Sequence, residues 1–143
     1  MQNVLNSVKS FCESINHNPC PNEKSPFKES HGEVYTPLEV IYHMLAQLPE
    51  HILKDPYIKY LDSGAGLGNF SLVLYFLLKS QNISENHILS NMIHIVEINR
   101  VNTAKIETMI NSIYSSVNEN SCPKSMSSNT LNVSTNISNI SNT

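Results

Sequence analysis

The chain has 143 residues, which is enough for one domain, and a formal net charge of −3. Nine Lys and Arg against twelve Asp and Glu exclude the global positive field of a protein that binds nucleic acid by charge alone. No apolar run reaches the length of a membrane span, and the N-terminus has no apolar signal-peptide core. Three widely spaced cysteines indicate free thiols, and His17 with Cys20 is too little for a metal site. We therefore expect a soluble intracellular protein, cytoplasmic by default with a viral or nuclear setting left open, without membrane association or bound metal.

The N-terminal third predicts two helices joined by a polar loop. The first helix is expected near residues 2–16, where apolar side chains fall on one stripe. The stripe consists of Val4, Val8, Phe11 and Ile15, with Leu5 and Cys12 beside it. Three prolines exclude regular structure from the loop over residues 16–33. The second helix is expected over residues 37–48, with Thr36 as its N-cap and Glu39 completing a capping box.

The middle of the chain predicts a parallel sheet. A strand is expected over residues 58–62, and an apolar helix over residues 69–80 follows a glycine-rich turn. A loop over residues 81–91 leads to a second strand over residues 92–98. A last amphipathic helix is expected from about residue 99 to residue 116, with an apolar side formed by Ile106, Met109, Ile110, Ile113 and Val117. Strand, turn, helix, strand and helix in this order form a βαβα unit, which indicates an α/β fold.

The turn itself, "YLDSGAGLGNF", has the residues of a nucleotide-binding loop. It follows a strand, so it lies at the sheet edge where ligands of parallel α/β folds bind. Gly64, Gly66 and Gly68 allow close approach of the backbone, and Glu97 at the end of the second strand can accept hydrogen bonds from ribose hydroxyls. Asp62 would repel a pyrophosphate and attract an ammonium group. The spacing therefore favours S-adenosylmethionine over NAD, and no Gly-Lys-Ser/Thr follows to make a P-loop.

A second motif, "HGEVYTPLEVIYHML", lies about 25 residues before Asp62. Together with the glycine loop it resembles the N6-adenine-specific DNA methyltransferases of the restriction–modification type. In that family a Gly-Glu-Val-Phe/Tyr-Thr-Pro segment precedes a helix and an Asp-Pro-x-x-G-x-G-x-F loop. The resemblance covers about residues 31–110. It implies a Rossmann-like class I methyltransferase fold, here partial, with an incomplete parallel sheet and flanking helices.

The resemblance implies contacts to S-adenosylmethionine from four groups of residues. The methionine part would be surrounded by Tyr35, Thr36 and Pro37. The amino-acid and ribose side would be wrapped by Asp62, Gly64, Ala65 and Gly66. The mouth of the loop would be formed by Asn69 and Phe70. The ribose hydroxyls and the adenine face would be met by Glu97 and Ile98.

The chain departs from the family where the methyl transfer would occur. The family's Asn/Asp-Pro-Pro-Tyr/Phe motif, which holds a flipped adenine, is absent from the sequence, so we predict no catalytic residue. Ser63 also replaces the proline that usually follows the acid. We expect an N-terminal helix and loop (1–30), a partial cofactor-binding domain (31–118) and a disordered Ser/Asn/Thr-rich tail (119–143).

These features leave three hypotheses. The first is an N-terminal fragment of a DNA adenine methyltransferase, cut before the catalytic motif and inactive alone, whose complete form acts on DNA. The second is a non-catalytic cofactor-binding or regulatory subunit that needs a partner chain to complete its fold. The third, a nucleotide-dependent oxidoreductase, is disfavoured by Asp62 and by the glycine spacing.

Overall fold

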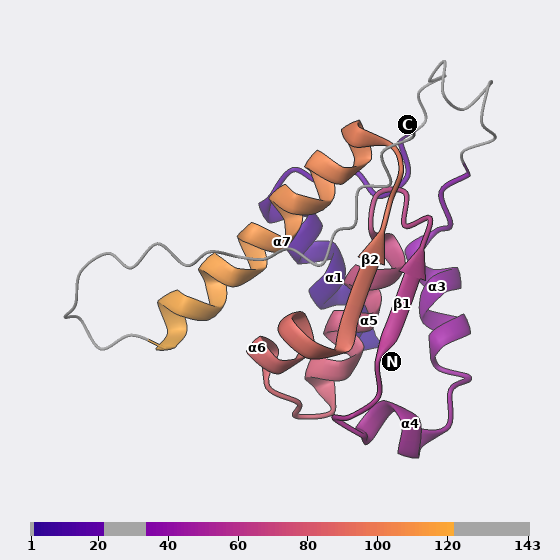
Figure 1. Ribbon diagram of the computed structural model, residues 1–143, viewed down its shortest axis with the longest axis vertical. Coiled ribbons are helices and arrows are strands. Elements are labelled where there is room, and N and C mark those ends of the chain that lie inside the picture. The colour runs from indigo at the N-terminus through magenta and orange to yellow at the C-terminus, as the bar shows by residue number, and fades with distance from the viewer. Residues whose placement is uncertain (1, 22–33, 122–143) are drawn as a thin grey trace, which may run out of the picture.

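The structure, a computed structural model, describes residues 2–21 and 34–121 (Figure 1). Its sheet has two parallel strands in this part of the chain, β1 (Tyr60–Ser63) and β2 (Ile93–Val96). The register pairs Tyr60 with Ile93 and Ser63 with Val96. Helix α5 (Asn69–Ser80) lies in the crossover between the strands. The predicted strand–helix–strand unit with parallel strands is therefore confirmed.

Helix α5 is the centre of the hydrophobic core. It has the bounds predicted for it, and its apolar side chains are buried almost all round. The fully or nearly buried ones are Leu72, Val73, Leu74, Tyr75, Leu77 and Leu78. A helix that is apolar on every side must be enclosed by other elements. Here the strands pack on one side of α5, and α1 (Gln2–Ser14) and α3 (Leu38–Leu45) pack on others.

Helix α1 is confirmed as a helix, and its buried face is centred on the edge of the predicted apolar side where Leu5 and Cys12 lie. The side chains that enter the core are Leu5, Val8 and Cys12. The other predicted members, Val4, Phe11 and Ile15, are only partly buried against the core. Positions 5, 8 and 12 follow the helical period as well as the predicted set does, and packing against α5 selects between the two stripes.

The predicted capping box at the start of α3 is wrong. The N-cap of α3 is Pro37, and no side chain caps the helix. Glu39 forms an ion pair with Lys9 of α1 instead, with Nζ 2.6 Å from Oε1. The helix also ends at Leu45, three residues before the predicted end, because the chain turns toward Pro49.

Three short helical segments occur where no helix was predicted. Helix α4 (Glu50–Lys54) has Pro49 as its N-cap and lies just before β1. The predicted loop 81–91 contains α6 (Glu85–His87), followed by a π-helical turn, η1 (Ile88–Met92). Ile88 and Met92 are fully buried in η1. Short helices of this kind form around buried apolar residues and have too few turns to show a period in sequence.

Helix α7 (Arg100–Ser121) is longer than predicted. Its buried side chains agree with the predicted apolar side, namely Ile106, Met109 and Ile113. The helix continues into the segment for which a disordered tail was predicted. The remainder of that tail, residues 122–143, lies outside the described residues. Residues 22–33 of the predicted loop also lie outside them.

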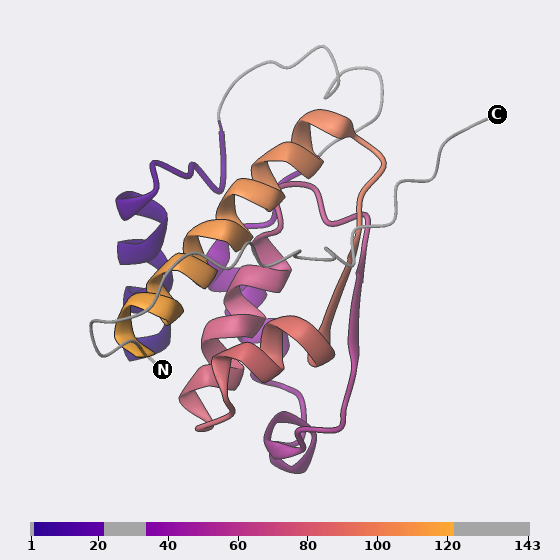
Figure 2. The same ribbon diagram turned by 60° about the vertical axis from the view of Figure 1, so that its left-hand side comes forward.

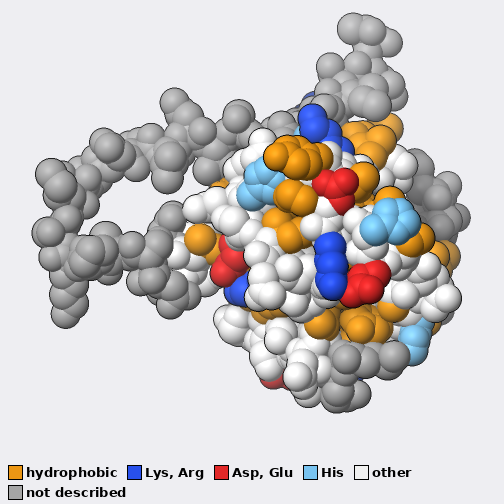
Figure 3. All heavy atoms as spheres, turned by 90° about the horizontal axis from the view of Figure 1, so that it is seen from below, with side chains coloured by type: hydrophobic (Ala, Val, Ile, Leu, Met, Phe, Trp, Pro, Cys, Tyr) orange, Lys and Arg blue, Asp and Glu red, His pale blue; other side chains and the backbone are white. Residues whose placement is uncertain are grey.

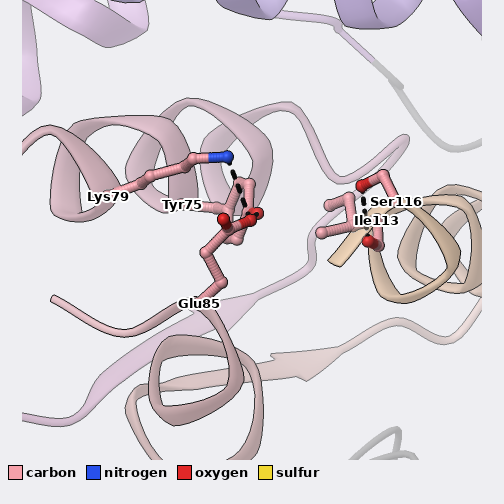
Figure 4. Close-up of polar contacts among 5 residues, drawn as sticks. All are labelled: Tyr75, Lys79, Glu85, Ile113 and Ser116. Atoms are coloured by element: carbon pink, nitrogen blue, oxygen red, sulfur yellow. Dashed lines mark hydrogen bonds and ion pairs between the residues drawn. The ribbon is translucent and has the colours of Figure 1, made fainter. Parts of the chain in front are cut away.

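A polar cluster joins α5 to α6 at the end far from the glycine loop (Figure 4). The hydroxyl of Tyr75 donates a hydrogen bond to Glu85 Oε2. Lys79 Nζ lies 3.0 Å from the same oxygen. Burial and the Glu85 carboxylate raise the pKa of Tyr75, so this phenol stays protonated as a donor. The cluster positions the connection that leads into η1 and β2.

The described helices lie on one side of the sheet, as Figure 2 shows with the strands at the right edge. Ile93 and Ile95 of β2 point into this core. On the other face Leu61 of β1 is 67% exposed. Parallel sheets are usually covered on both faces, so this two-layer arrangement is unusual for parallel strands.

Candidate functional site

A cleft of about 470 Å³ lies where the two parallel strands end. Its floor is the glycine loop, which leaves β1 at Ser63. The backbone N–H groups of Gly64 and Ala65 both donate to the carbonyl oxygen of Val96, at 2.8 and 3.2 Å. The loop is therefore fixed to the end of β2. This is the edge of a parallel sheet at which ligands bind in open α/β folds, and the volume suits a small-molecule site.

The three glycines all adopt left-handed backbone angles, which explains their spacing. Gly64 and Gly68 have φ +79°, and Gly66 has φ +58°. At Gly68 an added Cβ would lie 3.0 Å from Met109 Cε and 3.2 Å from Ile106 Cγ1 of α7. Gly68 is thus needed for the loop to turn into α5 and also for α7 to pack against it.

Asp62 has two roles at the end of β1. Its Oδ2 accepts hydrogen bonds from Ser71 Oγ at 2.7 Å and from the Ser71 backbone N–H at 3.2 Å, which caps the first turn of α5. Its Oδ1 has no hydrogen bond to the described residues and is not a buried atom, so it is open to the cleft that Asp62 lines. Burial raises the pKa of this carboxyl, and the negative charge of Glu97 adds to the effect.

Glu97, directly after β2, is 5% exposed. Oε2 accepts the backbone N–H of Gly66 at 2.6 Å, and Oε1 accepts the backbone N–H of Asn99 at 2.7 Å. The sequence predicted that this carboxylate would accept ribose hydroxyls. In the structure each oxygen already has one intramolecular donor, and a carboxylate oxygen can accept a second. Glu97 therefore ties the glycine loop to the start of α7 and still faces the cleft.

Asn69, the first residue of α5, is more deeply placed than its predicted position at the mouth. It is 5% exposed, and its Nδ2 donates to the carbonyl oxygen of Pro19 at 2.7 Å. The carbonyl oxygen of Thr36 lies 3.5 Å from the same nitrogen. One side chain thus links the glycine loop to two distant segments. The sequence carries no periodic signal for a contact across 50 residues, so the contact with Pro19 was missed.

The remaining predicted residues lie around the same cleft, with one exception. The ring of Tyr35 covers the loop, because a Cβ added to Gly66 would meet its Cε1 at 3.6 Å. Ile98 is 69% exposed at the rim. The structure brings together ten of the predicted residues: Tyr35, Thr36, Asp62, Gly64, Ala65, Gly66, Asn69, Phe70, Glu97 and Ile98. Pro37 does not line the cleft, because it forms the N-cap of α3.

Four lining residues were not predicted, namely Val34, Ile41, Leu67 and Asn99. Asn99 had a usable signal. Its Oδ1 accepts the backbone N–H of Val101, two residues on, which is the hydrogen bond of a helix N-cap. An Asn directly before an amphipathic stretch and two positions after a strand-end acid predicts such a cap at the cleft.

The part of the cleft lining that the structure describes is acidic. Within residues 2–21 and 34–121 its charged lining residues are Asp62 and Glu97, and none of these lining residues is Lys, Arg or His. On the face of the molecule shown in Figure 3, Lys and Arg side chains are interspersed with acidic and apolar ones and form no basic patch. The electrostatics of the cleft therefore favour a cationic or hydroxyl-rich ligand and disfavour a polyphosphate.

Comparison of the chain with protein-family models, with curated proteins and with solved structures finds no match in any of the three. Among the described residues no helix is long and apolar enough to cross a membrane. Within the same residues no cluster of three or more His, Cys, Asp or Glu side chains could hold a metal ion.

Proposed function

We propose that the cleft binds S-adenosylmethionine, and that the chain supplies the cofactor-binding part of an N6-adenine-specific DNA methyltransferase with a Rossmann-like fold. The observation that carries the proposal is the acidic cleft at the ends of two parallel strands, where the described lining consists of the glycine loop, Asp62, Glu97 and uncharged neighbours. A dinucleotide or nucleoside triphosphate brings several negative charges. S-adenosylmethionine brings an ammonium and a sulfonium against one carboxylate, so its net charge complements the cleft.

Each part of the ligand has a suitable group in the lining. The open Oδ1 of Asp62 can accept a charge-assisted hydrogen bond from the ammonium group. The unused lone pairs of Glu97 can accept from ribose hydroxyls. The apolar rim, including the exposed Val34 and Ile98, can pack on a flat base.

The proposal assigns no methyl transfer to this chain alone. The sequence contains no Asn/Asp-Pro-Pro-Tyr/Phe tetrapeptide, and its seven prolines include no adjacent pair. Without that motif no residue accepts the hydrogens of a target adenine or stacks on its ring. In the complete family enzyme DNA is the substrate, so the catalytic motif and the DNA-contacting surface would have to come from elsewhere.

A second candidate function is that of a cofactor-binding or regulatory subunit that joins a partner chain. The face of the sheet that no described helix covers favours it, because Leu61 is 67% exposed in the middle of a parallel strand. Both strands of the described sheet are also edge strands. A partner that adds strands and covers this face would complete the layers that parallel sheets normally have.

Titration calorimetry of the purified chain tests the proposal. We expect S-adenosylmethionine to bind and NAD not to bind. Gly66→Val should remove binding because it places a branched side chain at positive φ under the Tyr35 ring, and Glu97→Ala should weaken it. Wild-type protein that gives no heat with S-adenosylmethionine overturns the proposal. Labelled methyl transfer to DNA by this chain alone would overturn the assignment as non-catalytic.

A further inference from the structure

Two buried polar atoms close to the cleft lack partners among the described residues. Asn69 Oδ1 and His17 Nε2 are both inaccessible to solvent, and neither has a hydrogen bond within the described part of the chain. Asn69 lies against the turn that holds His17, because its Nδ2 donates to the carbonyl oxygen of Pro19, two residues after His17. Burial lowers the pKa of His17, and Asn69 opposes that effect. An imidazole N–H and an amide oxygen are complementary, yet they fall short of hydrogen-bond geometry here.

We propose that His17 is a positioning residue for Asn69, and that through this pair the turn after α1 becomes part of the ligand cleft. The inference rests on the proposed function, since the cleft ligand used to test it is S-adenosylmethionine. His17 belongs to residues 2–21, which lie outside the segment that resembles the methyltransferases. His17 does not line the cleft. It lines a separate cavity of about 360 Å³ between the turn after α1 and the start of α3.

The geometry gives Asn69 little freedom if His17 is in place. Its Nδ2 is held by the Pro19 carbonyl oxygen at 2.7 Å, so Oδ1 must point away from that carbonyl. The backbone of the turn after α1 is also fixed, because the backbone N–H of His17 donates to the Cys12 carbonyl oxygen at 2.8 Å. The imidazole is then the group that meets Oδ1. Rotation of the amide would place two carbonyl oxygens against each other at Pro19.

The consequence for the cleft follows from the place of Asn69 in the chain. It is the residue directly after Gly68, and it lines the cleft between the glycine loop and Thr36. A change in its side chain moves the start of α5 and the loop that precedes it. The free energy of ligand binding should therefore depend on His17, although His17 does not touch the ligand. Ligand binding that brings His17 Nε2 and Asn69 Oδ1 into a hydrogen bond would be more favourable, because the bond removes the desolvation penalty of two unpaired buried atoms.

The test compares His17→Leu, which keeps bulk without an N–H, with His17→Gln, which places an amide N–H near the position of Nε2. We expect His17→Leu to weaken S-adenosylmethionine binding by about three- to tenfold, the usual worth of one hydrogen bond, and His17→Gln to retain the wild-type affinity within about twofold. In an Asn69→Ala background His17→Leu should have no further effect. Glu13→Gln, which lines the same second cavity, is the control and should bind as the wild type does.

Hydrogen exchange of the protein without ligand separates this inference from the proposed function. In His17→Leu we expect faster exchange in peptides that cover residues 66–72 as well as those that cover residues 15–21. Faster exchange in residues 15–21 alone overturns the positioning role, whether or not S-adenosylmethionine binds. Equal affinities of His17→Leu and wild type, or additive effects of His17→Leu and Asn69→Ala, overturn it as well. A wild-type protein without affinity for S-adenosylmethionine overturns the proposed function and the ligand dependence, while the exchange pattern still decides the positioning role.

Discussion

The carboxylate of Glu97 accepts the backbone N–H of Gly66 at 2.6 Å, which joins the glycine loop to the end of β2 across 31 positions of sequence. The second oxygen of Glu97 accepts the N–H of Asn99 at 2.7 Å. One buried side chain thus holds the loop between β1 and α5 against the connection between β2 and α7. The acid at the end of the second strand shapes the cleft before any ligand enters it.

Glu97→Gln is expected to lower the free energy of unfolding by about 1–3 kcal/mol, because a carboxamide cannot accept both backbone N–H groups. Its single oxygen can keep one donor, and its NH₂ group then faces the other. Urea denaturation followed by circular dichroism measures the change. Glu107→Gln on α7, outside the cleft, is the matched control and should stay near wild type. A midpoint for Glu97→Gln equal to that of the control would show that the two hydrogen bonds contribute nothing.

Gly64 and Gly68 form a matched pair for a second prediction, because both have φ +79°. An alanine at Gly64 would meet nothing within 4 Å, so only backbone strain of about 1 kcal/mol is expected. An alanine at Gly68 adds a clash with Met109 and Ile106, which should cost about 1–3 kcal/mol more. Thermal unfolding of the two variants checks the order. Equal destabilisation would mean that α7 yields to the added methyl group without cost.

The parts of the fold that were predicted from sequence have strong local signals. Helix α5 could be bounded because glycines precede its long apolar run. The parallel strands could be placed because Asp62 lies near the end of β1 and Glu97 lies directly after β2. Helices α4 and α6 were missed, since five and three residues show no period. The apolar side of α1 was predicted, but its most deeply buried residues were not, because Leu5, Val8 and Cys12 fit the helical period as well as Val4, Val8, Phe11 and Ile15 do.

In the candidate site, too, the residues with a local sequence signal were predicted and those placed by tertiary packing were not. Its floor was predicted because the glycines, Asp62 and Glu97 lie next to strands whose ends must meet at one edge. The contact of Asn69 with the turn after α1, which holds His17 and Pro19, depends on packing between α1 and α5. No spacing in the sequence encodes that packing. The capping box failed for a related reason, because a tertiary ion pair with Lys9 takes the Glu39 carboxylate away from the helix start.

Asp62→Asn is expected to separate stability from binding. The raised pKa of Asp62 means that the folded state holds the proton more tightly than the unfolded state. Its contribution to stability is therefore present below the ordinary value of 3.8 and is lost as the pH rises through the folded pKa. At neutral pH the ionised group is a cost, so Asp62→Asn should leave the free energy of unfolding unchanged or higher. Its amide oxygen can still accept from Ser71.

The same substitution should weaken S-adenosylmethionine binding by about tenfold or more, because the ammonium group loses a charged acceptor. Asp55→Asn, an acid outside the cleft, is the control for calorimetry. Binding by the wild type should also weaken as the pH falls toward the raised pKa of Asp62. Retained affinity in Asp62→Asn would remove this carboxylate from the ligand site.

His17 is expected to make stability depend on pH below neutrality. Burial is the largest cause of its lowered pKa, and Lys105 acts in the same direction while Asn69 opposes it. Because the folded pKa lies below the unfolded value of 6.5, the neutral ring stabilises the fold above that pH, and this stability is lost as the pH falls.

His17→Gln has no ring to protonate, so its free energy of unfolding should fall less than that of the wild type between about pH 7.5 and about pH 5.5. Urea titrations at the two pH values measure both slopes, and a slope for His17→Gln that equals the wild-type slope would mean that the buried imidazole titrates as it does in the unfolded chain.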